Sequence, residues 1–515
     1  MNGAESLVRT LVDSGVTVCF ANPGTSEMHF VAALDDNPDM RCVLGLFEGV
    51  VTGAADGYAR MAERPAATLL HLGPGLGNGL ANLHNARRAR SPMVNVVGEH
   101  ATYHRQYDAP LTADIEGVAR PMSHWVRTSR FADEVARDGA EAVRAAITAP
   151  GQIATLILPA DTAWNEAPGG AAAPLPLPAP PPVQPDAVAA AAAALASGEP
   201  TVLLMNGAAL FRDNLSRAGR ISAATGARLY SDTFVPRLQR GAGIVGVERL
   251  PYFGEQVEEA LRDVRHMILV GTRPPVSFFA YPGKPSDLVP PGCAVHSLIG
   301  VEGDIAGALE ALATAVDAPR AVDGAVAQRP DPARDGPLDP AAIARAVGAW
   351  LPENAIVVDE AATSGFALPA ATAGCPPHDW LGLTGGSIGQ GLPTAVGAAV
   401  ACPDRKVLCL EADGSGMYTV QALWTMVREQ LDVTVVIFAN RKYAILQVEF
   451  MRVGAHNPGP KAMSMLDLSN PDLDWVSLAA GMGMEATRAT TIADFNAQFE
   501  SAIKSRGPRL IEAVI

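Results

Sequence analysis

Residues 411–446 read EADGSGMYTVQALWTMVREQLDVTVVIFANRKYAIL, and this stretch decides the fold. It starts at the end of an apolar strand, passes through a segment whose apolar residues recur at helical spacing, and enters a second apolar strand over residues 433–439. In a right-handed βαβ unit the two strands run parallel, so Asp413 and Asn440, which each follow one strand, emerge at the same carboxyl edge. The stretch therefore predicts a doubly wound α/β unit with these two side chains close together.

The chemistry of this predicted edge suits a metal-bound diphosphate. A carboxylate and an amide oxygen are hard donors of the kind that Mg²⁺ prefers. Gly414 and Ser415 open the following helix, so that backbone N–H groups can face phosphate oxygens. An Asp-Gly pair alone is more often a simple turn and helix cap. The asparagine at the end of the next strand is what favours a Mg²⁺ site here.

The same alternation of apolar strands and helical patterns extends outward over the whole chain, which indicates parallel sheets covered on both faces. We expect three doubly wound parallel-sheet α/β domains. Residues 166–187 are too rich in proline for helix or sheet and read as an extended linker. The predicted domains are residues 1–165, 188–320 and 336–515. Their expected strands are 16–21, 41–46, 66–72, 92–98 and 153–159, then 201–207, 266–272 and 293–298, then 354–360, 406–413, 433–440 and 509–515.

Composition limits the class of protein. The chain has 515 residues, of which 48% are apolar and 18% charged, and its net charge of −15 makes nucleic acid a poor partner. The six cysteines form no close pair that would indicate a zinc site or a disulfide framework. The first residues lack the apolar core of a signal peptide, and no long uncharged apolar run predicts a membrane span. We expect a cytoplasmic protein.

Three strand ends of the first domain carry candidate acid–base or binding groups. Glu48 follows a strand within LGLFEGVVTGAADGYAR, residues 44–60, and begins a helix among apolar neighbours. Asn22 and Thr25 leave the first strand in FANPGTS, residues 20–26, and His71 leaves the third in LHLGPG, residues 70–75. Each residue has a plainer explanation: a first-turn glutamate on the helix dipole, a helix-capping threonine, a satisfied buried histidine. Parallel topology nevertheless predicts that all of them lie at one edge.

These motifs resemble those of the thiamine-diphosphate-dependent decarboxylase and acetolactate synthase superfamily, over essentially the whole chain. The family motif is a Gly-Asp-Gly at one strand end and an Asn-Asn at the next. Here Ala412 replaces the first glycine and Ala439 the first asparagine, and both changes spare the side-chain ligands. The resemblance implies thiamine diphosphate as cofactor. It also implies Mg²⁺ bound by Asp413, Asn440 and the backbone carbonyl of Lys442.

The resemblance assigns further roles to this chain's residues. Glu48 matches the glutamate that contacts the aminopyrimidine ring of the cofactor. In LTGGSIG, residues 383–389, Ile388 matches the bulky residue that bends the cofactor, and Gly386 would offer its carbonyl to the 4′-amino group. Thr363, after another strand, would bind a diphosphate oxygen. The full set of expected cofactor contacts is Thr363, Gly386, Ser387, Ile388, Asp413, Gly414, Ser415, Asn440 and Tyr443.

Within the superfamily the chain is closest to benzoylformate decarboxylases. Thr25 matches a serine that contacts the substrate carboxylate there, and His71 matches a histidine used for proton transfer. The loop DAPLTADI, residues 108–115, lacks the Phe and Gln of acetolactate synthases, and its Pro110 and Leu111, with Asn22, would line the substrate pocket. The resemblance implies a 2-oxo acid decarboxylase and/or carboligase. The alternative is an acetolactate-synthase-like enzyme that condenses 2-oxo acids.

Two further expectations concern product and assembly. The stretch VSFFAYP, residues 276–282, lacks the second active-site histidine of benzoylformate decarboxylases, so we expect an aldehyde acceptor to be used and a 2-hydroxyketone formed. The central domain has no GxGxxG signature, and we do not expect FAD, although a flavin-dependent oxidase of the same fold is an alternative. Because the first and third domains of this superfamily meet across a subunit boundary, we expect at least a homodimer and favour a homotetramer.

Overall fold

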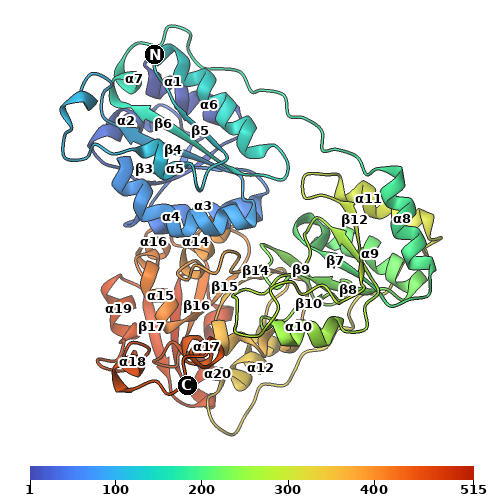
Figure 1. Cartoon of the computed structure of the whole chain (residues 1–515). Helices are drawn as coiled ribbons and strands as arrows, with labels where there is room; N and C mark the ends of the chain where they lie inside the picture. The colour runs from blue at the N-terminus through green and yellow to red at the C-terminus, as the bar shows by residue number, and fades with distance from the viewer.

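The computed structural model describes residues 1–515, and the chain folds into three α/β units. In Figure 1 the first unit lies at the top, the third at the lower left and the central one at the right. Each contains its own largely parallel sheet with helices on both faces. The expectation of three doubly wound parallel-sheet domains is therefore confirmed.

The first sheet has six parallel strands in the order β2-β1-β3-β4-β6-β5. Its three strands β2, β1 and β3 lie side by side, so the segments that follow them share one edge. The strands are β1 (Val18–Asn22), β2 (Arg41–Leu44), β3 (Ala66–Leu70), β4 (Met93–Glu99), β5 (Trp125–Thr128) and β6 (Ile153–Pro159). The helices are α1 (Gly3–Asp13), α2 (Met28–Asp35), α3 (Glu48–Ala62), α4 (Leu72–Ala89), α5 (Ile115–Ala119), α6 (Ala132–Ile147) and α7 (Ala160–Trp164), with 3-10 turns η1 (Thr25–Glu27) and η2 (Arg105–Tyr107).

The central sheet has five parallel strands in the order β10-β8-β7-β11-β12. An extended segment crosses from the first unit to this one and ends at Gln184, where α8 begins earlier than the composition suggested, because proline is compatible with the first helical turn. The strands are β7 (Thr201–Met205), β8 (Arg228–Ser231), β10 (Glu248–Arg249), β11 (His266–Val270) and β12 (Ala294–Ile299). The helices are α8 (Pro185–Ala196), α9 (Arg212–Thr225), α10 (Gly254–Leu261) and α11 (Ile305–Ala315), with η3 (Gly207–Leu210).

The third sheet has the order β17-β18-β16-β15-β13-β14-β9. Its last strand, β9 (Leu238–Arg240), comes from the central stretch of sequence and pairs antiparallel with β14 (His378–Gly382). The other strands are β13 (Ile356–Glu360), β15 (Val407–Ala412), β16 (Val433–Ala439), β17 (Glu485–Ala489) and β18 (Arg509–Val514). The helices are α12 (Pro340–Trp350), α13 (Leu368–Ala371), α14 (Gly391–Ala401), α15 (Asp413–Gly416), α16 (Ala422–Arg428), α17 (Ala444–Arg452), α18 (Pro460–Ser464), α19 (Trp475–Gly481) and α20 (Ile492–Lys504), with η4 (Ala362–Gly365) and η5 (Met417–Thr419).

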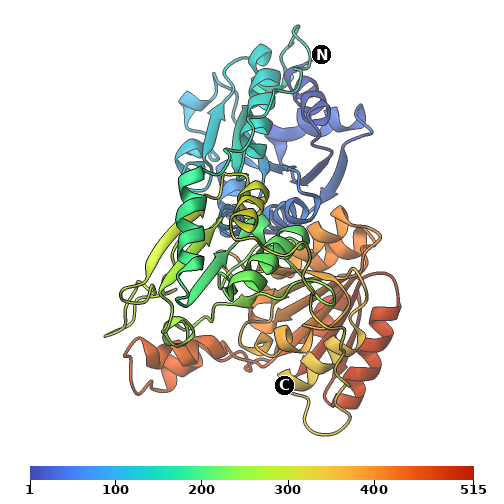
Figure 2. The ribbon, with the colours of Figure 1, turned by 90° about the vertical axis from the view of Figure 1, so that its right-hand side faces the viewer.

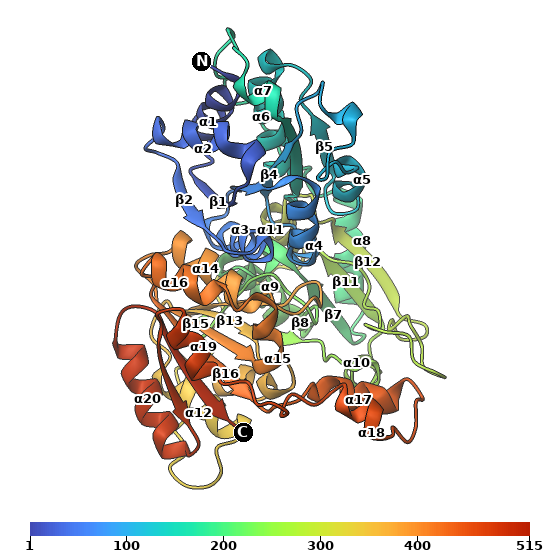
Figure 3. The same ribbon diagram turned by 90° about the vertical axis from the view of Figure 1, so that its left-hand side faces the viewer.

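Helices α3 and α14 join the first unit to the third (Figures 1 and 3). The two helices approach backbone to backbone, because Gly57 faces the main chain of Thr394 and Gly397 faces that of Ala54. One continuous apolar core runs through this contact, and a second core joins the third unit to the central one. Figure 2 shows the central unit against both of its neighbours. None of the helices has the length and apolar character needed to cross a lipid bilayer.

Candidate active site

Glu48 lies at the carboxyl edge of the first sheet, at the start of α3, and its side chain is buried. One carboxylate oxygen, Oε2, accepts a hydrogen bond from Asn78 Nδ2 of α4 at 2.9 Å. The other oxygen, Oε1, has no partner within the chain and lies beside Gly75, where an added Cβ would come within 3.0 Å. The structure thus holds this carboxyl in a fixed direction and leaves one oxygen free.

A second acidic group at this edge orients His71. Glu27 is buried, and its Oε2 lies 2.8 Å from His71 Nδ1 while accepting the Gly24 backbone N–H at 2.7 Å. Ser26 Oγ donates to the other oxygen at 2.8 Å. A carboxylate on Nδ1 fixes the tautomer of the imidazole and leaves Nε2 as its free nitrogen. The Glu27 carboxylate therefore orients His71, and the Nε2 of this histidine has no hydrogen-bond partner within the chain.

The sequence did not point to Glu27, although it stands in the same motif as Asn22 and Thr25. The structure shows why it matters: the 3-10 turn η1 directs Glu27 inward, towards His71, while Thr25 stays exposed. The cap residue of η1 is Gly24, so Thr25 does not act as a helix cap, and its hydroxyl makes no hydrogen bond within the chain. The only available signal was the Glu three residues after Gly24, a spacing common to capping turns.

The loop predicted to line a substrate pocket lies over the same helix as His71. Ala113 packs against Gly73 in the first turn of α4, and a Cβ on that glycine would come within 2.7 Å of the Ala113 side chain. Asp114 then caps α5 by accepting the Gly117 N–H at 2.9 Å. Pro110 and Leu111, just before, are exposed. The structure therefore places this loop beside the first turn of α4, with Pro110 and Leu111 exposed to solvent.

At the third sheet, Asp413 and the residues after Asn440 come together as the βαβ argument predicted. Asp413 Oδ2 accepts the backbone N–H of Arg441 at 2.6 Å, and Oδ1 accepts that of Gly414 at 2.9 Å. Asn440 Oδ1 accepts the Lys442 N–H at 3.1 Å. Burial raises the pKa of the Asp413 carboxyl. A buried carboxylate with no cationic side chain bonded to it would be stabilised by a bound cation.

An open hollow of about 500 Å³ begins at this strand end. It is lined by Asn440, Arg441, Lys442, Gln447, Pro460, Met463, Ser464, Asp467 and Ser469. The ring of Tyr443 lies against Gly414, where any side chain would collide with it. Thr363 stands in η4, after the neighbouring strand β13, with its hydroxyl unbonded. Asn440 and Lys442, two of the expected metal ligands, line the hollow, while Asp413, Gly414 and Thr363 lie at the ends of the neighbouring strands β15 and β13.

The loop between β14 and α14 presents alternate backbone carbonyls. Those of Gly385, Ser387 and Gly389 accept hydrogen bonds from side chains of α4, with His84 Nε2 at 3.0 Å, Asn85 Nδ2 at 2.7 Å and Asn82 Nδ2 at 3.2 Å. The carbonyls of Gly386 and Ile388 accept none. Gly386 has a φ of +75°, which favours glycine. The two free carbonyls belong to the residues that the motif assigned to the cofactor.

Two buried glutamates lie beneath this loop. Glu360, the last residue of β13, accepts the Gly389 N–H at 2.8 Å and that of Gly391, and burial raises its pKa to about 7. Burial and the nearby Glu360 also raise the pKa of Glu411 well above its usual range. Glu411 Oε2 has no hydrogen-bond partner. The two buried carboxyls therefore disfavour each other's ionised form, which adds to the effect of burial on both pKa values.

The chain was compared with known proteins. Residues 1–120 match the family model described as thiamine pyrophosphate enzyme, N-terminal TPP binding domain, and residues 373–513 match the corresponding C-terminal TPP binding domain. A Mycobacterium tuberculosis protein, provisionally named acetolactate synthase large subunit IlvX, is 57% identical over 100% of this chain and 99% of its own.

This chain is a thiamine-diphosphate-dependent enzyme.

Other relatives of this thiamine-diphosphate-dependent enzyme come from both branches of the superfamily. Benzoylformate decarboxylase of Pseudomonas aeruginosa is 30% identical over 97% of this chain and 96% of its own. The structure of a Rhodococcus jostii thiamine-diphosphate-dependent 4-hydroxybenzoylformate decarboxylase superposes with a TM-score of 0.86 at 26% identity, covering 100% of this chain and 99% of that one. The family resemblance inferred from the motifs is confirmed.

Proposed function

We propose that this enzyme is a Mg²⁺- and thiamine-diphosphate-dependent 2-oxo acid decarboxylase and/or carboligase of the benzoylformate decarboxylase type. The observation that carries the proposal is the first-domain edge, where Glu48 keeps one free carboxylate oxygen and Glu27 orients His71. An acid with one free oxygen and a histidine with a free Nε2 are two separate proton carriers at one site. His71 is the feature that the resemblance assigns to benzoylformate decarboxylases rather than to acetolactate synthases.

The residues of the third domain fit the cofactor. Asp413, Asn440 and the unpaired carbonyl of Lys442 would hold Mg²⁺, since all three donors are hard oxygens. Gly414 and Ser415 would face the diphosphate from the first turn of α15, and Thr363 would reach it from η4. Thiamine diphosphate supplies the electron sink that makes the bond beside a 2-oxo acid carbonyl cleavable.

Each first-domain group would then have a defined task. Glu48 would hold a proton against the aminopyrimidine ring through its free Oε1. The Thr25 hydroxyl, which is exposed and unbonded, would bind the substrate carboxylate. His71 would carry a proton at Nε2, and the Pro110–Leu111 tip would keep water from the apolar part of the substrate.

Side chains of the central domain bear on which product forms after decarboxylation. Its 276–282 stretch brings aromatic side chains rather than a histidine, and the ring of Phe278 packs on Gly386. Phe278 and Phe279 are 39% and 51% exposed, so they form a surface for an apolar acceptor. We therefore propose that a 2-oxo acid and an aldehyde together give a 2-hydroxyketone and carbon dioxide.

An acetolactate-synthase-like reaction is the second candidate. It is favoured by the name of the 57% identical relative. In that case two 2-oxo acid molecules would condense, and one would serve as acceptor in place of an aldehyde. The two candidate reactions use the same cofactor site. They differ in the acceptor substrate that would bind beside Phe278 and Leu111.

A substrate panel separates these candidates. Purified enzyme with Mg²⁺ and thiamine diphosphate is incubated with aromatic and aliphatic 2-oxo acids, each with and without an aldehyde, and carbon dioxide, free aldehyde, 2-hydroxyketone and 2-hydroxy-2-methyl-3-oxo acid are measured. We expect 2-hydroxyketone when both substrates are present. Free aldehyde alone would contradict carboligation, and condensation of pyruvate with itself would favour the second candidate.

We also propose that the working enzyme is at least a homodimer, and a homotetramer as a pair of dimers. Large apolar side chains are exposed at both candidate edges of the single chain: Met28 and Leu46 in the first domain, and Phe366, Tyr418 and Leu446 in the third, each at least 44% accessible. Apolar surface beside a site is expected to be covered by another subunit. Sedimentation equilibrium that gives only monomer would contradict this.

A further inference from the structure

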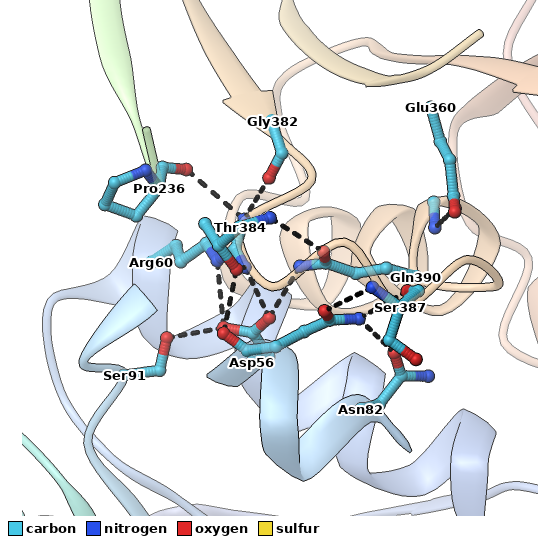
Figure 4. A network of polar contacts seen from close by, with 12 residues as sticks. Asp56, Arg60, Asn82, Ser91, Pro236, Glu360, Gly382, Thr384, Ser387 and Gln390 are labelled. Atoms are coloured by element: carbon cyan, nitrogen blue, oxygen red, sulfur yellow. Dashed lines mark hydrogen bonds and ion pairs between the residues drawn. The ribbon is translucent and has the colours of Figure 1, made fainter. Parts of the chain in front are cut away.

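We propose that Asp56, Arg60 and Gln390 are positioning residues, which fix the 382–391 loop so that the free carbonyl of Gly386 and the side chain of Ile388 meet the cofactor. The proposal rests on the proposed function, because it takes these two residues as cofactor contacts. Figure 4 shows the network, which lies between α3 of the first domain and the loop before α14. None of its three central side chains belongs to the cofactor motif.

The centre of the network is a buried ion pair within α3. Arg60 lies one turn after Asp56, and its Nη2 and Nε bond to the two carboxylate oxygens at 2.6 and 2.9 Å. The side-chain exposures are 2% for Arg60 and 0% for Asp56. Ser91 Oγ adds a third bond to the carboxylate at 2.5 Å. A buried pair this completely bonded has one geometry, because any shift would leave a charge unpaired.

The donors of Arg60 also reach the start of the loop. Nη1 donates to the carbonyl of Gly382 at 2.8 Å, and Nη2 donates to Thr384 Oγ1 at 3.0 Å. A longer bond of 3.3 Å reaches the carbonyl of Pro236 in the central stretch of the chain. Thr384 Oγ1 in turn donates to the carbonyl of Asn85 on α4 at 2.8 Å. One side chain of the first domain thus fixes the first residues of the loop.

Gln390 fixes the other end to the same pair. Its Nε2 donates to Asp56 Oδ2 at 2.8 Å, and its Oε1 accepts the backbone N–H of Thr384 at 3.3 Å. Gln390 is 2% exposed. Thr384 and Gln390 are therefore bonded to each other, and both are connected to the Asp56–Arg60 pair. We call the five residues between them, 385–389, the arch.

The arch explains which carbonyls stay free. His84, Asn85 and Asn82 of α4 bond to the carbonyls of residues 385, 387 and 389, respectively, and the carbonyls of 386 and 388 stay unbonded. A shift of the loop by one residue would change which carbonyls meet the α4 side chains. Because Arg60 and Gln390 hold both ends of the loop, such a shift is prevented. The network thereby fixes the positions of the Gly386 carbonyl and of Ile388.

The network also ties the loop to the helix that begins at Glu48 of the same chain, which in the expected dimer serves the neighbouring site. Glu48 begins the helix that carries Asp56 and Arg60, and an α-helix is rigid over two or three turns. Stability alone does not require such a network, since well-packed apolar residues replace buried ion pairs without loss in many proteins. A polar network with one geometry instead selects one loop position.

The test uses the full-length enzyme and measures cofactor binding apart from turnover. Gln390→Met removes both hydrogen bonds at similar volume, and Thr384→Val removes one hydroxyl while Thr384→Ser keeps it. Lys406→Met is the matched control, because it breaks the half-buried Lys406–Asp432 ion pair at the opposite edge of the same sheet. The measurements are the Kd of thiamine diphosphate with Mg²⁺ by fluorescence quenching, the near-ultraviolet circular dichroism of the bound cofactor, and the Tm of the apo protein.

We expect Gln390→Met and Thr384→Val to raise the Kd about tenfold and to change the dichroism of the bound cofactor, because each leaves a buried polar partner unpaired. Thr384→Ser should bind as the wild type does, and Lys406→Met should lower Tm with an unchanged Kd. Wild-type affinity in both loop variants, or equal weakening in the control, would overturn this proposal alone. Failure of the wild type to bind thiamine diphosphate would overturn the proposed function together with it.

Discussion

The candidate residues of the first and third domains both lie at the carboxyl edge of a parallel sheet, but the two edges carry different functional groups. In the first domain the strand ends carry two ionisable side chains, Glu48 and His71, each with a partner that sets its direction. In the third they carry oxygen ligands and bare backbone groups around Asp413 and Asn440. Under the proposed function the difference is a division of labour between two similar sheets: one edge would perform acid–base chemistry and the other would hold the cofactor.

Backbone strain marks both edges. Leu72 after β3, Ala362 after β13 and Arg441 after β16 all have φ near +50 to +60°, a region that residues with a side chain rarely occupy. Such strain costs free energy and persists only where surrounding structure enforces it. Each of these three residues directly follows or precedes a candidate site residue, whereas other residues with positive φ, such as Glu63 and Arg90, lie at helix ends.

The division of labour predicts its largest effect at Glu48. Glu48→Gln keeps the shape of the side chain but cannot exchange a proton with the cofactor ring, so turnover should fall about a thousandfold. Thiamine diphosphate should remain bound, because no metal or phosphate contact is lost. Initial rates and cofactor Kd on the same preparation check this, with Asn78→Ala as the milder control. Full activity in Glu48→Gln would break the comparison.

The opposite pattern is expected at Asp413. Asp413→Asn removes the charge that would bind Mg²⁺, so the affinity for the metal with thiamine diphosphate should fall about a hundredfold. Because the asparagine NH2 cannot accept one of the two backbone N–H groups that the carboxylate accepts, the metal-free variant should also be less stable than the metal-free wild type. Mg²⁺ titrations and urea unfolding measure both properties. An unchanged Mg²⁺ titration would remove Asp413 from the ligand set.

Glu27 sharpens the comparison within the first domain. Glu27→Gln leaves His71 in place but loses the carboxylate that fixes its tautomer, and turnover should fall about tenfold. Ser26→Ala is the control, since it removes a neutral donor to the same carboxylate and should have a smaller effect. Cofactor affinity should be unchanged in both variants. Equal rates for Glu27→Gln and wild type would show that the orientation of His71 is immaterial.

The smallest effect is expected away from both edges, at His378 where β14 begins. Burial lowers the pKa of this histidine to about 4. The unfolded chain takes up a proton below its usual pKa of about 6.5, and the folded chain does not until about pH 4, so stability falls as pH drops through this window. The loss is on the order of 3 kcal/mol. His378→Gln should lose less stability than wild type between pH 7 and 4.5 in urea unfolding, with normal turnover at neutral pH.

The sequence predicted the long central strands because continuous apolar runs need two covered faces. It missed β5, β8, β10, β14 and β17, which lack such a run. It also missed that β9 leaves the central unit to pair with β14. Strand pairing of this kind depends on which surfaces meet, and no local pattern records that.

The amino-acid sequence alone determined the fold class and showed that Glu48, Asp413 and Asn440 stand at strand ends. It could do so because the apolar periodicity that marks strands and helices is a property of residues close together in sequence. Tertiary structure alone decided the partners of buried polar groups. Glu27 meets His71 across 44 residues, and Asp56 meets Gln390 across 334. A buried polar group must be paired, but packing between distant elements chooses the group that pairs with it.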